Sequence, residues 1–394
     1  MKILSLIFSF STLLASSQSW AYPEFIAYGY SSCLTCHFNG LGGGPLNDYG
    51  RALWSAEIAG RPFYKASTSD EDIANQSGFL GSVPLPFYIR PHVNYRGMDY
   101  RQNPGSASSD TTVWLNMQEN FGVTVPFSES GNYLVTATWG RNIIPANYGQ
   151  GTQGFTNVVA QEYYARIQVL EGWWVYAGLM DKVFGIRNVN HESYQRQYQG
   201  FQVYNNNPDG TNSSQGIVLH RVSEKWEFAL NYFAGNPYDD TNYKLSGGSA
   251  TAEFEVGENK RLGASVLSGT STIKNKNIAA IHYRQQISKG SSLLAEYGLI
   301  HDYPANSSDL VGGYNLIEAM VFLTRGYNFV ATTERYNRSF NATDPDKWKW
   351  SFGFLMFPFA RVELRTEATF LRSLSTQVAS PDSWIVDGQV HVSL

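Results

Sequence analysis

Alternation of apolar and polar residues along many short segments is the feature that most restricts what this chain can fold into. Near residue 90, apolar side chains occupy alternate positions of one segment, namely Phe87, Ile89, Val93 and Tyr95. Most positions between them are polar or charged, and the same period of two recurs at residues 226–232, 252–256, 348–354, 361–370 and 384–394. This period is typical of β-strands with one apolar and one polar face. The chain is therefore predicted to be mainly β.

Short and long connections alternate between these segments. Tight turns fall at residues 126–132, 170–173, 223–226, 257–260, 288–291, 324–327 and 358–361. Longer loops rich in Gly, Asn, Asp and Pro fall near residues 98–111, 143–156, 185–214, 236–246, 302–313, 339–346 and 373–382. Short turns at one end and long loops at the other are typical of an outer-membrane barrel. We predict a porin-like transmembrane β-barrel of roughly sixteen antiparallel strands over residues 85–394, with both termini in the periplasm.

A soluble β-sandwich or propeller is the alternative to a barrel in outer-membrane lipid. Such folds have no reason to segregate long from short connections. They would also bury charged strand faces such as Arg361, Glu363, Arg365 and Glu367 in an apolar core, at a large cost. A polar barrel lumen accommodates these residues. The net charge of -4 argues against nucleic acid as a partner.

The first 21 residues have the features of a signal peptide. One Lys precedes an apolar run from Ile3 to Ala15, and a polar stretch then ends in Ser19-Trp20-Ala21. Small residues at the first and last of these three positions suit signal peptidase. An uncleaved anchor is less favoured, because the run contains serines and is shorter than the roughly 20 residues that span a bilayer. We therefore expect a mature chain that starts near Tyr22 and is exported to the bacterial outer membrane.

Both cysteines of the chain lie in one short motif, Cys33-Leu34-Thr35-Cys36-His37. C-x-x-C-H is the attachment sequence of c-type haem, in which the two thiols bind the vinyl groups and the histidine ligates the iron. A disulfide, a thioredoxin-like redox pair or half of a zinc site are the alternatives. The redox pair would need a βαβ context and the zinc site further ligands nearby. We predict one covalent haem c, with His37 as an axial ligand.

The segment after the motif, Gly44-Pro45-Leu46-Asn47-Asp48-Tyr49-Gly50-Arg51, resembles a segment that follows the attachment site in many small c-type cytochromes. In those proteins a proline carbonyl typically accepts the N–H of the proximal histidine. The resemblance implies that Pro45 does this for His37 and that Arg51 also lies at the cofactor. Asn47 or Asp48 can cap a short helix at residues 52–59, and Ser69 with Asp72 can cap a second. These elements define an α-helical haem domain at residues 22–80.

The sixth ligand of the haem iron has no candidate within this domain. No Met and no second His occur in it, so the ligand is either water or a residue of the barrel. His92 and His391 both face the predicted lumen, and they lie on the first and last strands, which become neighbours when a barrel closes. The candidate ligands on the barrel are His92 and His391.

A signal peptide, one N-terminal C-x-x-C-H motif and a roughly sixteen-stranded barrel together resemble the monohaem cytochrome-porin fusion proteins of iron-oxidising bacteria. The sequence motif covers only about residues 22–60, and the rest of the resemblance is architectural. It implies an electron carrier, or Fe(II) oxidase, whose haem sits at the periplasmic mouth or in the lumen. Electrons would pass from an extracellular donor, Fe(II), to a periplasmic c-type cytochrome. The alternative is a porin-like barrel whose haem domain serves another redox partner or gates the pore.

Overall fold

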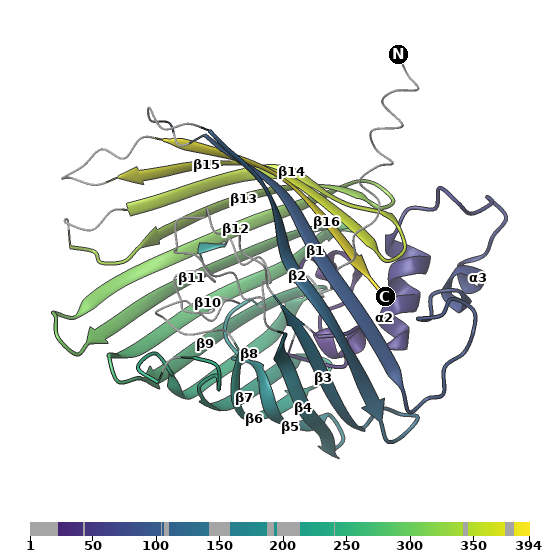
Figure 1. Cartoon of the computed structure of the whole chain (residues 1–394), viewed down its shortest axis with the longest axis horizontal. Coiled ribbons are helices and arrows are strands. Elements are labelled where there is room, and N and C mark those ends of the chain that lie inside the picture. The colour runs from purple at the N-terminus through teal and green to yellow at the C-terminus, as the bar shows by residue number, and fades with distance from the viewer. Residues whose placement is uncertain are drawn as a thin grey trace.

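The chain forms a closed antiparallel β-barrel of sixteen strands with a small helical domain at one end (Figure 1). The structure is a computed structural model that describes residues 23–41, 44–103, 105, 110–141, 158–186, 193–194, 213–239, 241–341, 346–374 and 382–394. The segment predicted as the signal peptide lies outside these residues. Each strand pairs with the next along the chain, and β1 pairs with β16 to close the sheet. The predicted fold class is therefore confirmed.

The strands have the following bounds: β1 Arg90–Asn103, β2 Thr111–Pro126, β3 Tyr133–Arg141, β4 Val159–Leu170, β5 Trp173–Asp181, β6 Ser213–Val222, β7 Trp226–Ala234, β8 Ser246–Gly257, β9 Lys260–Thr270, β10 Lys274–Ser288, β11 Ser291–Pro304, β12 Leu310–Thr324, β13 Tyr327–Asn337, β14 Asp346–Phe359, β15 Val362–Leu374 and β16 Ser383–Ser393.

The alternation read from the sequence separates a lipid-facing surface from a polar lumen. On β9, Arg261, Gly263, Ser265 and Leu267 are buried, whereas the residues between them are exposed. The exposed outer face carries large apolar side chains such as Leu262, Val266, Ile281, Tyr297, Phe352 and Phe354. Aromatic rings continue across β14, β15 and β16, where Trp350 and Phe370 have centroids 5.6 Å apart and Phe370 and Trp384 4.9 Å apart. An apolar band with aromatic residues is the surface that a bilayer requires.

The connections depart from expectation in two places. Residues 271–273, between β9 and β10, form a short connection at the long-loop end that the sequence analysis did not identify. The segment after β5 was expected to be an outer loop, but its described part enters the lumen. The backbone N–H groups of Gly185 and Ile186 donate to Ser265 and Glu296, and that of Tyr194 donates to Glu334. Polar residues on the inner wall thus satisfy a backbone that has no sheet partner.

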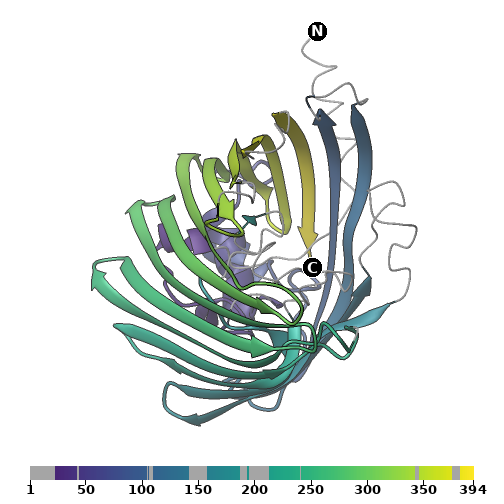
Figure 2. The same ribbon diagram turned by 90° about the vertical axis from the view of Figure 1, so that its left-hand side faces the viewer.

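The helical domain lies at the short-turn end of the barrel, where the C-terminus also lies, and is visible through the lumen from the opposite end (Figures 1 and 2). It consists of η1 (Pro23–Tyr28), η2 (Cys33–Thr35), α2 (Asp48–Leu53), η3 (Trp54–Ile58) and α3 (Asp70–Asn75). Asn47 caps α2, so this helix starts earlier than the predicted residue 52. Ser69 and Asp72 form the predicted capping box of α3. None of the helices among the described residues has the length and apolar character to cross a membrane.

Barrel side chains hold this domain through its backbone carbonyls. Arg325 donates to the carbonyls of Ala56 and Ala59, the latter at 2.9 Å from its Nε. Arg361, which has a positive φ of 70° in the β14–β15 turn, donates to Gly78. An apolar cluster lies between the two parts and contains Ala27, Cys36, Leu46, Trp54, Ile58 and Ala59 from the domain and Met320, Val330, Leu355 and Phe357 from the barrel. The domain and the barrel therefore share one core.

Candidate functional site

The cysteine motif forms one tight helical turn. The backbone N–H groups of Cys36 and His37 both donate to the carbonyl of Cys33, at 3.2 and 3.0 Å. Residues three and four positions apart lie on the same side of such a turn. Cys33, Cys36 and His37 are therefore brought together, and the two cysteines are not joined by a disulfide. This is the spatial set that covalent haem attachment needs, and it excludes the disulfide alternative in this conformation.

A backbone carbonyl fixes the orientation of the His37 ring, but that carbonyl belongs to Gly44. His37 Nδ1 lies 3.0 Å from Gly44 O, whereas Pro45 O accepts the N–H of Phe38 at 3.1 Å. The expectation for Pro45 is therefore off by one residue. Gly44 has φ +71°, a left-handed conformation that glycine adopts easily. With the proton on Nδ1 directed at this oxygen, Nε2 is the nitrogen left to act as a metal ligand.

The segment around α2 is hydrogen-bonded to the cysteine turn. Asn47 accepts the N–H of Gly50 at 2.8 Å and donates to Thr35 O at 3.1 Å, so one side chain joins the helix to the cysteine turn. Arg51, expected at the cofactor, donates to the carbonyl of Pro91 at 3.2 Å and so contacts β1. Burial, aided by the nearby positive charge of Arg361, lowers the pKa of Arg51 to about 10. Arg51 remains protonated at neutral pH and fastens α2 to the barrel wall.

The segment after His37 runs along the inner wall of β4–β6. Asn39 donates to Glu162 at 2.7 Å, and Arg166 donates to the carbonyl of Phe38 at 2.6 Å. Apolar side chains pack around these contacts, namely Leu34, Phe38 and Leu41 against Leu134, Tyr164, Trp174, Tyr176 and Val218 among others. The backbone of Gly40 lies so close to the wall that a Cβ would meet His220 Cε1 at 3.1 Å. The cysteine motif therefore sits inside the short-turn end of the lumen.

The two histidines considered as sixth ligands both face the lumen, as expected, but they differ in their contacts. His391 Nδ1 lies 3.0 Å from Glu363 Oε2, and Arg96 contacts its Nε2. His92 Nε2 lies 2.9 Å from Thr138 Oγ1. Since the His391 ring lies between a carboxylate and a guanidinium of neighbouring strands, His92 is the better candidate of the two.

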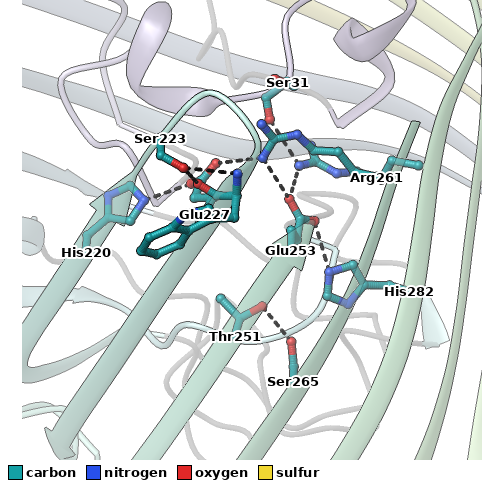
Figure 3. Close-up of polar contacts among 11 residues, drawn as sticks. Ser31, His220, Ser223, Glu227, Thr251, Glu253, Arg261, Ser265 and His282 are labelled. Carbon is teal, nitrogen blue, oxygen red and sulfur yellow. Dashed lines mark hydrogen bonds and ion pairs between the residues drawn. The ribbon is translucent and has the colours of Figure 1, made fainter. Parts of the chain in front are cut away.

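A row of ionisable residues crosses the inner wall beside the cysteine motif (Figure 3). We name it the β6–β10 belt; its members are His220, Glu227, Glu253, Arg261, His282 and Arg284. His220 Nε2 lies 2.8 Å from Glu227 Oε1, and His282 Nε2 lies 2.9 Å from Glu253 Oε1. Periodicity along the sequence does not identify this belt, because the lateral order of its residues depends on the register between strands.

A metal site made only of side chains is not found at this end of the lumen. In the part of the chain that the structure describes, no group of three or more His, Cys, Asp or Glu residues is arranged to hold a metal ion.

The environment of the cysteines makes a prediction about their reactivity in protein produced without haem. Burial, and secondarily the neighbouring Cys33, raises the pKa of the Cys36 thiol to about 12, whereas Cys33 is partly exposed. At pH 8 only about one Cys36 in 10⁴ is a thiolate, so we expect iodoacetamide to label Cys33 first. The labelling rate of Cys36 should rise about tenfold per pH unit up to its pKa. Peptide mass spectrometry measures both rates. Equal labelling rates of Cys33 and Cys36 in the folded chain would contradict the packing of Cys36, whereas equal rates in the denatured chain would not.

Comparison with known proteins identifies the barrel but not the helical domain. No protein-family model and no curated protein matches the chain. Among solved structures, Pseudomonas putida OprB has a TM-score of 0.60 at 9% identity and the anion-selective porin of Comamonas acidovorans 0.59 at 8%. The outer membrane channel DcaP of Acinetobacter baumannii has 0.54 at 11%. Each match covers 78% of this chain and 94%, 99% and 97% of those proteins, respectively. The protein has the fold of the outer-membrane porins.

Proposed function

We propose that this protein is an outer-membrane electron-transfer protein that carries one covalent haem c. In this proposal, electrons pass from an extracellular donor, Fe(II), to a periplasmic c-type cytochrome. The observation that carries the proposal is the conformation of the C-x-x-C-H motif inside the barrel. Cys33, Cys36 and His37 lie on one turn, and the Gly44 carbonyl orients the imidazole.

The residues present fit haem c. The two thiols are not engaged in a disulfide, and Nδ1 of His37 is used by a backbone carbonyl, which directs Nε2 to the axial role. Haem c would supply a one-electron redox centre. The chain's own contribution is to hold that centre in place. Asn47 bonds to the cysteine turn, and Asn39 and the carbonyl of Phe38 bond to β4 of the barrel wall. His92 is our proposed sixth ligand from the barrel.

The position of the motif supports transfer between two compartments. The domain lies at the short-turn end of the barrel (Figure 2), and this end faces the periplasm in outer-membrane barrels. A centre at this position is accessible to a periplasmic protein and is approached from outside through the lumen. Donor oxidation before the periplasm is reached has a further advantage for iron, because the Fe(III) product precipitates and need not be imported. Each Fe(II) ion oxidised to Fe(III) releases the one electron that the periplasmic acceptor takes up.

A porin-like channel with a haem domain that gates the pore, or that serves another redox partner, is the second candidate. The fold of the barrel supports it. The inserted segments argue against free diffusion, because the motif and the described part of the β5–β6 connection both contact the inner wall. The two candidates differ in whether the haem is reduced from outside, and in how much the protein conducts.

Reduction by external iron tests the first candidate. Anoxic intact cells that express the protein are supplied with Fe(II), and the α band of c-type haem is recorded against cells that express the Cys36→Ser variant. We expect the band with the wild-type protein and not with Cys36→Ser, because this variant lacks one of the two thioether positions. The His391→Ala variant is the matched control and should retain the band, because its imidazole is already bonded to Glu363 and Arg96. No haem reduction by Fe(II) in wild-type cells would contradict Fe(II) as the donor.

Ion conductance tests the channel candidate. The full-length protein and a variant that lacks residues 23–83 but retains the signal segment are each reconstituted in planar lipid bilayers. We expect the variant to conduct far better, because the deletion removes the helical domain from the short-turn end. Circular dichroism controls for loss of the barrel. Equal conductance of the two proteins would show that the domain does not obstruct the pore, and would favour a passive channel.

A further inference from the structure

Arg261 on β9 is a buried arginine whose donors the described residues do not fully satisfy. Its side chain is 2% exposed, and neither Nε nor Nη1 has a hydrogen-bond partner there. The nearest carboxylate oxygens, Glu227 Oε2 and Glu253 Oε2, lie 3.7 and 3.9 Å from Nη1, beyond hydrogen-bond distance. A buried charged donor without a hydrogen bond is costly. Arg261 therefore has the features of a residue that receives an anionic ligand.

Neighbouring residues engage both glutamates and keep them from Arg261. His220 binds the other oxygen of Glu227, at 2.8 Å, and His282 binds the other oxygen of Glu253, at 2.9 Å. Arg284 donates to Glu253 as well. Gly263 on β9 has no side chain, and this permits the contact between His282 on β10 and Glu253 on β8. A Cβ at Gly263 would collide with His282 and would lie 2.8 Å from Glu253 Cγ. The two carboxylates are thus bonded to other members of the belt (Figure 3), and the guanidinium of Arg261 is left for another acceptor.

The N-terminal segment contacts both ends of the β6–β10 belt. At one end, the carbonyl of Ser31 accepts a hydrogen bond from Arg284 Nη2 at 3.1 Å. At the other end, the backbone of Gly40 packs against the ring of His220. Arg284 and Arg261 are direct partners across the β9–β10 ladder. The chain between Ser31 and Gly40 contains Cys33, Cys36 and His37, so the cofactor-attachment residues belong to a segment that contacts the belt at both ends, and Arg261 neighbours the Arg284 end.

We propose that Arg261 binds a propionate group of the haem attached at Cys33 and Cys36. The inference rests on the proposed haem. A haem carries two carboxylates at neutral pH, and a guanidinium binds a carboxylate with two parallel, charge-assisted hydrogen bonds. Nε and one terminal nitrogen of Arg261 supply such a pair of donors. Arg284 has a different role, because it holds the backbone at Ser31 and so fixes the distance between the motif and the belt.

The test compares Arg261→Gln with Arg365→Gln in the full-length, haem-loaded protein purified from outer membranes. Arg365 is also a buried lumen arginine, but it bonds to Glu367 at 2.7 and 2.9 Å, so its loss controls for a change of one lumen charge. We expect both variants to keep covalent haem. Only Arg261→Gln should shift the propionate-bending band in resonance Raman spectra. It should also lower the midpoint potential further than Arg365→Gln does, because an uncompensated propionate favours ferric haem.

Arg261→Lys provides a second variant in case Arg261→Gln does not fold. It retains the charge but replaces the two-pronged contact by a single donor, so we expect the potential to stay close to wild type while the propionate band still shifts. A propionate band identical to wild type in the variants that fold would overturn the assignment, and Arg261 would then serve only to separate Glu227 from Glu253. Wild-type protein without covalent haem would overturn the proposed function instead, and with it this inference.

Discussion

Closure of the hydrogen-bond ladder between β1 and β16 is the constraint on which the rest of the structure depends. In lipid, every strand needs partners on both edges, and only a closed sheet provides them. Closure forces one face of each strand inward, so Arg96, His391 and Glu363 meet as direct neighbours across β1, β16 and β15. The lumen thereby collects charged side chains that cannot reach lipid. Two of these, Arg166 and Arg284, hold backbone carbonyls of the helical domain, and so do Arg325 and Arg361 from the short turns.

The helical domain depends on the barrel because it is too small to bury a sufficient core alone. Its apolar side chains pack partly on barrel residues, such as Trp54 on Phe357, whose ring centroids lie 6.0 Å apart. Its helices are short, and its longest stretches run without regular structure between contacts with the wall. The cysteine turn is thus positioned by the barrel as much as by its own domain. If the proposed haem is present, its ring would add the apolar material that the domain lacks.

Features set by local chemistry could be predicted from the sequence, and features set by register could not. The barrel followed from the period of two, and the start of α3 from the Ser69–Asp72 capping box. The carbonyl that binds His37 was assigned to Pro45 by resemblance; it belongs to Gly44, since the left-handed conformation there redirects the peptide. The inward path of residues 183–186 depends on partners on β7, β9 and β11. The β6–β10 belt likewise joins residues from five strands, which periodicity alone cannot align.

In the proposed function, the barrel holds one redox centre between two compartments. The central claim of this proposal is that haem is joined to Cys33 and Cys36. Intact mass spectrometry of the mature protein, purified from the outer membrane of cells that produce c-type cytochromes, tests this most directly. The account predicts a mass higher than that of the polypeptide by one haem, with the addition retained after denaturation and located in the peptide that contains both cysteines. A mature chain with the mass of the unmodified polypeptide would contradict it.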